Sequence, residues 1–392
     1  MKKLRLLFAS YIATITVLFL YSFTQVDLSL TLSKFSIYQT LEKSFQYLGF
    51  FQRPFSAIIF SAILFLLFIF YLLFLYFAKG KKIQPKQMKI LILLTFVLLV
   101  FSYNAFSYDL FNYIFDAKII THYFQNPYIH KASDFPNDPM LNFMRWTHRT
   151  YPYGPTWLLL TVPLSFIGVN IFLPTFFMFK LLMGVSFLGS CYLIYKISEK
   201  LSPENKLVNL AFWAFNPLVL IESLVSAHND IPMIFLMLFS IYLFLQRKKT
   251  LSLLSFLFSI GVKFSTGVFF PVAVYIFVMD RFKKNIDWEK IFIISFFLAI
   301  ITVFAAALRT TFQPWYILFP LSMATFVPKK YFIFIPSLIG SFFAASVYIP
   351  YVLLTDYARG YPLVVMNVEA AGIVSIVVLT FLFFLRVKFL KH

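Results

Sequence analysis

The sequence predicts an all-α, polytopic transmembrane helical bundle. Hydrophobic residues make up 61% of the 392 residues and charged residues only 12%, whereas a soluble domain is about half apolar and about a quarter charged. Long apolar runs alternate with short basic clusters. A span needs about 20 apolar residues, so the chain has room for roughly 10 to 13 helices, some short or broken. This composition excludes a soluble enzyme, a disordered chain and a fibrous protein.

The basic clusters predict how the chain crosses the membrane. The net charge is +19, but the Lys and Arg residues lie between apolar runs. They are typical of cytoplasmic loops rather than of a nucleic-acid-binding surface. The prediction is a multi-pass plasma-membrane protein with both termini in the cytoplasm. The first apolar run has no small-residue cleavage site after it, so we expect an uncleaved span.

The first half of the chain is predicted to reach a large outer loop. Spans are expected at about 5–24, 55–78 and 89–106, and they leave segment 107–155 outside. Basic residues at 196–206 mark the next inner loop, so residues 156–195 must cross an odd number of times. They contain two apolar pieces, of which one is expected to be short, re-entrant or interfacial. A further span is expected at 207–226.

The second half contains a predicted broken helix pair. Residues 250–279 lie between two basic clusters, so they cross an even number of times. Two helices of about 13 residues rise only about 20 Å each, which is short of a bilayer core of about 30 Å. The tip at 261–267 is therefore expected to stop at membrane depth and to line protein or a wet cavity. Three more spans follow, with Gln313–Tyr316 and Asp356 outside.

The first chemical motif opens the outer loop. Read as a helix, segment 107–118 places Asp109, Asn112 or Tyr113, and Asp116 on one face. Ser107 is a candidate N-cap. Such a helix would lie along the outer membrane surface with its acidic face toward a cavity. The alternative is a solvated face of an ordinary loop helix.

Two turn motifs and one polar span end follow. Asn126-Pro127-Tyr128 and Tyr151-Pro152-Tyr153-Gly154-Pro155 are predicted turns, whose aromatic residues can also be plain membrane anchors. Farther on, Asn216-Pro217 and Glu222 precede His228-Asn229-Asp230. An acid and a histidine beside a span end usually face a polar interior. His228 could carry a proton, bind a metal with Asp230 or contact a sugar, and a simple helix cap is the alternative.

Two basic residues are candidates for binding phosphate. Lys263 lies in the predicted tip, where an ammonium group requires an anionic partner or water. Arg309 lies just before Gln313-Pro314-Trp315-Tyr316 and is the second candidate. Snorkelling toward the membrane surface is the alternative role for Lys263.

Together these motifs resemble those of the GT-C superfamily of integral-membrane glycosyltransferases. The similarity rests on Asp-Leu-Phe-x-Tyr at 109–113, Asn-Pro-Tyr, Tyr-Gly-Pro, Asn-Pro-Leu-Val-Leu with its downstream His-Asn-Asp, the Lys of the broken pair and Pro-Trp-Tyr. It covers about residues 85–325 and is greatest to bacterial polyprenol-phosphate-mannose-dependent mannosyltransferases. Tyr108 departs from that group, which tends to have a basic residue before the acid.

The resemblance implies a function and roles for these residues. A single domain, 1–392, would transfer a hexose, expected to be mannose, from a polyprenyl-phosphate donor. The acceptor would be a lipid-linked or cell-envelope glycan or glycolipid at the outer face of the membrane, and the transfer would invert the anomeric centre. Asp109 matches the family's proposed base. The residues expected to bind substrate or its phosphate are Asp116, Tyr113, Tyr153, His228, Asn229, Asp230, Lys263, Arg309, Trp315 and Tyr316.

Two other classes of protein were weighed. A transporter or flippase for a lipid-linked sugar typically binds its cargo near the midplane and often has inverted repeats. Here the acids gather in one outer loop and the sequence has no visible repeat. A non-catalytic assembly protein explains neither Asp109 nor Lys263. The sequence implies no certain cofactor, and a divalent cation is left open, as are the sugar, acceptor and linkage.

Overall fold

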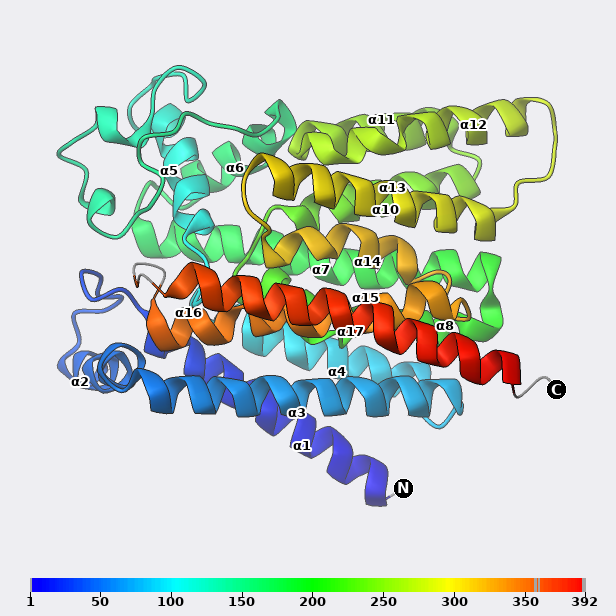
Figure 1. The fold of residues 1–392 in the computed structure, drawn as a ribbon. Helices are drawn as coiled ribbons and strands as arrows, with labels where there is room; N and C mark the ends of the chain where they lie inside the picture. Colours follow the sequence, from blue (N-terminus) through cyan, green and yellow to red (C-terminus); the bar gives the residue numbers. More distant parts are fainter. Residues whose placement is uncertain (1, 356–357, 359, 390–392) are drawn as a thin grey trace.

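The computed structural model describes residues 2–355, 358 and 360–389. The described chain is 77% helical and contains no strand, which confirms the predicted all-α class. Asp356, used above as a topology marker, lies outside the described residues. Figure 1 shows most of the long helices running side by side in one direction.

Seven helices of the described chain are long and apolar enough to cross a membrane. They are α1 (Lys2–Ser22), α3 (Arg53–Lys79), α7 (Phe172–Leu201), η7 (Phe264–Phe269) with α12 (Phe270–Arg281), α13 (Trp288–Arg309), α15 (Tyr331–Ser346) with α16 (Tyr348–Leu354), and α17 (Tyr361–Phe389). The shorter apolar helices are α6 (Pro155–Ile167), α10 (Asp230–Leu245) and α11 (Lys249–Val262). The chain is therefore a multi-pass membrane protein.

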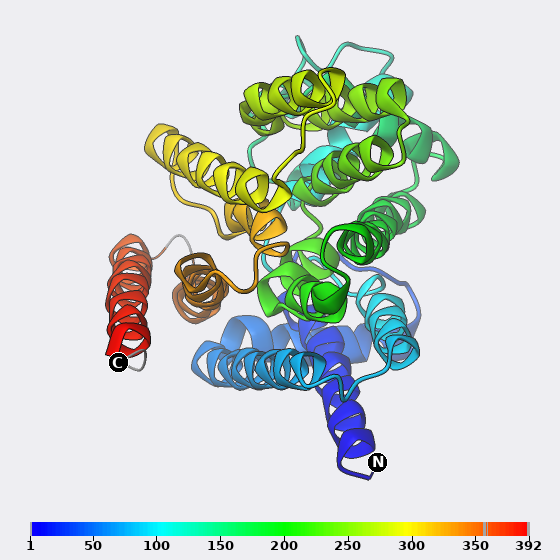
Figure 2. The same ribbon diagram turned by 90° about the vertical axis from the view of Figure 1, so that its right-hand side faces the viewer.

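The helices form two groups around a central pair. α7 packs against α10, and α1, α3 and α4 (Pro85–Leu99) lie on one side of this pair in Figure 2, with α11, α12 and α13 on the other. α17 lies at the edge and packs on α15. Only 6% of the most apolar stretch of α17 is buried inside the protein, so most of its side chains are free to contact lipid.

The two ends of the helical bundle carry different parts of the chain. The start of α1 and the end of α17 lie at one end of the bundle in Figure 1, and the polar segment between α5 (Asp109–Thr121) and α6 lies at the other. The basic clusters likewise predicted that the first and last spans begin and end on the same side of the membrane. Which end faces the cytoplasm stays a prediction.

The expected span at 207–226 is not one straight helix. It is bent by 55° between α8 (Lys206–Ala214) and the pair α9 (Pro217–Leu220) and η6 (Ile221–Val225). Pro217 disfavours the helical conformation at the residue before it, and Asn216 is extended, with ψ 121°. The Asn216 side chain accepts a hydrogen bond from the backbone nitrogen of Leu218, which starts the next helix.

The predicted broken helix pair is present. α11 ends at Val262, Lys263 is extended with φ −147° and ψ 124°, and η7 leads into α12. The two apolar pieces of 156–195 are likewise separate helices, the short α6 and the long α7. A Cβ on Gly154 would stand 2.3 Å from the carbonyl oxygen of Gly261. The outer segment and the tip of the broken pair therefore touch backbone to backbone.

Candidate functional site

A cavity of about 910 Å³ is lined by residues of the α5 to α6 region, α13, α16 and α17. Its walls include six residues that the sequence singled out. These are Asp109, Asp116, Tyr153, Lys263, Trp315 and Tyr316. Segments far apart in the chain thus contribute to one hollow.

Helix α5 carries the two acids of the cavity. It runs across the direction of the long helices (Figure 1), and its apolar face, Leu110, Phe111, Ile114 and Phe115, is fully buried against the bundle. The helix is therefore packed inside the protein rather than lying on a membrane surface as expected. Its N-cap is Tyr108, not Ser107. Ser107 contributes in another way, because its Oγ accepts a hydrogen bond at 3.1 Å from the backbone nitrogen of Asp109.

Asp109 lies between the cavity and a buried histidine. Its side chain is 18% exposed, and Oδ2 is 3.8 Å from Nε2 of His228. Burial raises the pKa of Asp109, and the electrostatic interactions of its carboxylate with His228 and Lys263 offset only part of that effect. A carboxylate with a raised pKa, one side open to a cavity and the other to an imidazole, is suited to accept a proton.

Asp116 lies two turns farther along α5. Burial, together with the negative charge of Asp109, raises the pKa of Asp116 to about 8. The group therefore holds its proton at neutral pH and can donate a hydrogen bond, unlike an ordinary aspartate with a pKa of about 3.9. Asn112 also lines the cavity, whereas Tyr113 is buried behind it, with its ring 5.4 Å from that of Tyr153.

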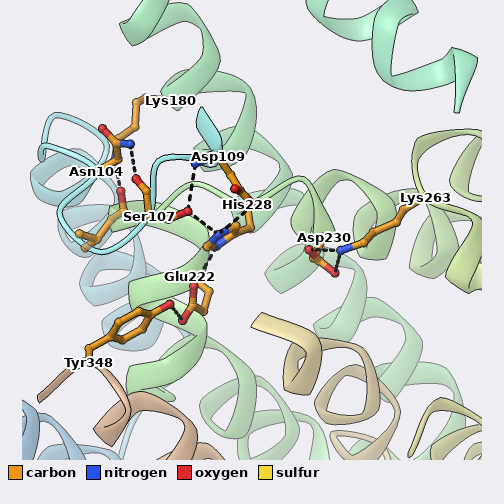
Figure 3. Close-up of polar contacts among 10 residues, drawn as sticks. Asn104, Ser107, Asp109, Lys180, Glu222, His228, Asp230, Lys263 and Tyr348 are labelled. Atoms are coloured by element: carbon orange, nitrogen blue, oxygen red, sulfur yellow. Dashed lines mark hydrogen bonds and ion pairs between the residues drawn. The ribbon is translucent and has the colours of Figure 1, made fainter. Parts of the chain in front are cut away.

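His228 lies beneath the cavity wall rather than in it. Its side chain is buried, and its ring stacks on Trp315 with centroids 3.9 Å apart. Nε2 lies 3.0 Å from Oγ of Ser107, and Nδ1 lies 2.9 Å from Oε2 of Glu222 (Figure 3). Asn229 is also fully buried. Neither residue belongs to the cavity lining, although both were candidates for binding substrate.

Asp230 is the anionic partner that Lys263 was expected to need. The Lys263 Nζ atom donates to both carboxylate oxygens of Asp230, at 2.9 and 2.8 Å (Figure 3). It also lies 5.5 Å from the centre of the Tyr316 ring. An ammonium group has three N–H donors, so a third remains, and Lys263 lines the cavity. Lys263 therefore does not snorkel away to the surface.

Arg309 is placed differently from the other candidates. It is the last residue of α13 and is exposed, and the cavity lining begins again only at Thr310. Two other arginines line the cavity, Arg145 and Arg149. Each guanidinium group lies over an aromatic ring, Arg145 at 4.2 Å from the centre of Tyr108 and Arg149 at 4.3 Å from that of Trp146. The sequence reasoning missed both, although they were the only arginines of the outer loop.

The described residues of the site do not form a cluster of metal ligands. Among residues 2–355, 358 and 360–389 there is no group of three or more His, Cys, Asp and Glu side chains placed to hold a metal ion. The pairing of Asp230 with Lys263, rather than with His228, also differs from the metal-ligand alternative raised for these two residues.

Comparison with known proteins gives one match. Residues 29–279, more than half of the chain, match the family described as alpha-(1->6)-mannopyranosyltransferase, N-terminal domain. No curated protein matches this chain. No solved structure matches it either. The matched region contains α5, the His228 loop and the Lys263 tip.

Proposed function

Because the chain belongs to the alpha-(1->6)-mannopyranosyltransferase family, we propose that it transfers mannose from a polyprenyl-phosphate donor to a lipid-linked or cell-envelope glycan. The observation that carries this proposal is the cavity itself. It combines a carboxylate of raised pKa, Asp109, with the cations Lys263, Arg145 and Arg149. A proton acceptor and a set of cations are what transfer from a sugar phosphate requires.

The walls of the cavity support a lipid-linked donor rather than a soluble one. Part of the lining comes from the start of α17, at Pro362, Val365 and Met366. Because most of α17 is exposed and apolar, this wall adjoins the region where lipid would lie. A polyprenyl chain could remain in the membrane while its phosphate-linked sugar enters the cavity. We place the cavity at the outer face of the membrane and both termini in the cytoplasm.

The residues suggest a direct, inverting displacement. Asp109 takes the proton of the acceptor hydroxyl as its oxygen attacks the anomeric carbon, and the bond from that carbon to the phosphate oxygen breaks. Negative charge grows on the departing lipid phosphate, where Lys263 stabilises it with the N–H that Asp230 does not use. Tyr153, Trp315 and Tyr316 offer the aromatic surfaces against which a sugar can be positioned.

Purified protein tests this proposal with a choice of donors. Incubation with radiolabelled polyprenyl-phosphate mannose and a lipid-linked mannoside acceptor should give a longer glycan, whereas a nucleotide mannose should give none. Transfer from the nucleotide sugar alone would contradict the proposed donor. Movement of the labelled lipid across a vesicle without transfer would instead favour a transporter or flippase.

The orientation has its own test. In a Cys191→Ala variant, which has no other cysteine, a cysteine is introduced at Ser133 in the outer loop or at Lys283 in a basic loop. An impermeant thiol reagent added to intact cells should label position 133 and spare position 283. The reverse pattern would place the cavity on the cytoplasmic face.

A further inference from the structure

A buried glutamate lies directly behind the histidine of the site. Glu222 and His228 both have side chains with 0% exposure, and Oε2 of Glu222 lies 2.9 Å from Nδ1 of His228. Within the described residues neither of these two atoms has a hydrogen-bond partner, because the contact between them is too bent to count as one. Catalytic contacts are often poorly aligned until substrate is bound. Each atom is therefore the other's available partner.

The backbone brings these two side chains together. Ala227 has a positive φ of 60°, a conformation that is strained for a residue with a Cβ. This turn lets the backbone nitrogen of His228 donate to the carbonyl oxygen of Glu222 at 3.0 Å. Lys180 of α7, itself buried, holds the turn from behind by donating to the carbonyl oxygens of Leu224 and Val225.

The second oxygen of Glu222 is fixed from another helix. The hydroxyl of Tyr348 in α16 donates to Oε1 of Glu222 at 2.7 Å (Figure 3). A buried carboxylate facing Nδ1 favours the tautomer that carries its proton on Nδ1. The lone pair of Nε2 then points toward Ser107 Oγ, at 3.0 Å, and Asp109 Oδ2, at 3.8 Å.

We infer that Glu222 is the positioning residue of a proton relay in which His228 receives from Asp109 the proton that the acceptor hydroxyl gives up. This inference rests on the proposed role of Asp109 as the base. The acceptor O–H bond breaks and its proton binds the Asp109 carboxylate. The oxygen electron pair forms the glycosidic bond as the bond from the anomeric carbon to the donor phosphate oxygen breaks, and the lipid phosphate leaves with that electron pair. The proton then passes from Oδ2 of Asp109 to Nε2 of His228, which restores the carboxylate. Glu222 stabilises the resulting imidazolium ion without touching substrate.

The charged surroundings of His228 are consistent with this direction of transfer. Glu222 of η6 faces one side of the ring and Asp109 of α5 the other, and Trp315 covers its face from the cavity side. Among the other titratable groups near the ring, the Asp230 and Lys263 charges are paired with each other. Tyr348 donates to Glu222, and Lys180 donates to Ser102. Asp116 and Arg149 interact electrostatically with Asp109.

The first test uses the pH dependence of transfer. Glu222→Gln keeps the size of the side chain but removes the charge that stabilises the imidazolium ion. We expect kcat to fall by about 10-fold to 100-fold, less than loss of the base itself, with little change in donor KM. The acid side of the rate profile should move to lower pH, because the neutral amide no longer favours protonation of the His228 ring, which must be neutral to receive the proton. Glu222→Asp retains the charge and should recover part of the wild-type profile.

A matched control separates positioning from packing. Glu42 is another buried glutamate, hydrogen-bonded to Thr31 and to the backbone nitrogen of Leu32, and it is not part of the cavity lining. Glu42→Gln should leave the pH profile of transfer unchanged even where it lowers stability. An unshifted profile in Glu222→Gln as well would overturn the relay and leave Glu222 as a packing residue.

A second measurement does not depend on activity or on folding of a Glu222 variant. In a chain that retains only His228 of the five histidines, ¹⁵N NMR of labelled imidazole reports the tautomer. The relay requires the proton on Nδ1, and a ring protonated on Nε2 throughout would refute it. If Asp109→Asn retained full transfer, the role of Asp109 as the base would fail together with the relay, whereas absence of transfer in the wild-type protein would overturn the proposed function itself. If only the Glu222 and NMR results failed, Asp109 would stand as the base without a relay.

Discussion

Replacing Asp109 by Asn removes the proposed proton acceptor while preserving the shape of the side chain. Loss of a general base costs about 10²–10⁴-fold in rate, or about 2.7–5.4 kcal/mol at about 1.36 kcal/mol for each factor of ten. The hydrogen bond from the Asp109 backbone to Ser107 is unaffected by this change. Donor binding should therefore persist, since Lys263 makes its contacts elsewhere.

The raised pKa of Asp109 also predicts how the transfer rate depends on pH. The base acts only when it is unprotonated, and burial raises the pKa of Asp109. Activity of the wild type should therefore fall on the acid side at a pH above about 3.9, the ordinary value for aspartate. The residual activity of Asp109→Asn should lack this acid limb.

Asp116→Asn is the matched comparison on the same helix. Because the pKa of Asp116 is raised to about 8, the wild-type group is protonated at neutral pH, and an amide reproduces its hydrogen-bond donor. The variant should be nearly as active as wild type at pH 7 and should lose any alkaline limb near pH 8. Steady-state transfer rates between pH 5 and 9 would check both variants. Full activity in Asp109→Asn with loss in Asp116→Asn would refute the assignment and exchange the two roles.

Three further changes have definite expected outcomes. Lys263→Met should raise the donor KM and lower kcat, whereas Lys263→Arg should retain part of the donor affinity and part of the turnover. If the Met variant were as active as wild type, Lys263 would have only a structural role. Gly154→Ala should reduce activity and lower the melting temperature, because the new Cβ would stand 2.3 Å from a backbone oxygen and overpacking costs about 1–3 kcal/mol; an unchanged variant would show that this contact is loose. Asp138→Asn should destabilise the outer segment by up to about 3–5 kcal/mol, because Lys118 and Asp138 form an ion pair whose side chains are only 13% and 1% exposed. The control Asp134→Asn changes a side chain that is 35% exposed, and it should alter the melting temperature little.

The membrane architecture was largely predictable from the sequence because it depends on local composition. Apolar length located the long helices, and the same arithmetic predicted the break between α11 and η7, although η7 with α12 is by itself long enough to span a membrane. The bend at Asn216–Pro217 was missed because hydropathy alone does not register a proline that begins a new helix. The Asn216-Pro217 dipeptide nevertheless indicates a helix break, because the residue before a proline disfavours the helical conformation.

The candidate site was only partly predictable. Asp109 and Asp116 share a helical face, so their presence in one cavity followed from periodicity. The Arg145 and Arg149 positions depend on an irregular loop, whose course no periodic pattern encodes. The partnership of Tyr348 with Glu222 joins residues 126 positions apart, and it arises only when α16 packs against the bent span. Arg309 was assigned to the cavity by proximity in sequence, but the last turn of α13 leaves its side chain exposed.

The buried Lys180 has a consequence for how the protein is assembled in the membrane. A lysine at the centre of an inserting helix costs about 2.5–3.5 kcal/mol on biological insertion scales, and Lys180 lies within α7, as its ninth residue. Helix α7 is synthesised before the carbonyl groups of Leu224 and Val225 that accept from the Lys180 Nζ atom. The side-chain nitrogen of Lys180 therefore has no hydrogen-bond acceptor from this segment until α9 and η6 have been inserted and have packed against α7. We expect insertion of α7 to be the slow step of assembly. The turn that presents His228 should form when Lys180 makes its hydrogen bonds to this turn. Assembly of the bundle and assembly of the site would then be one event.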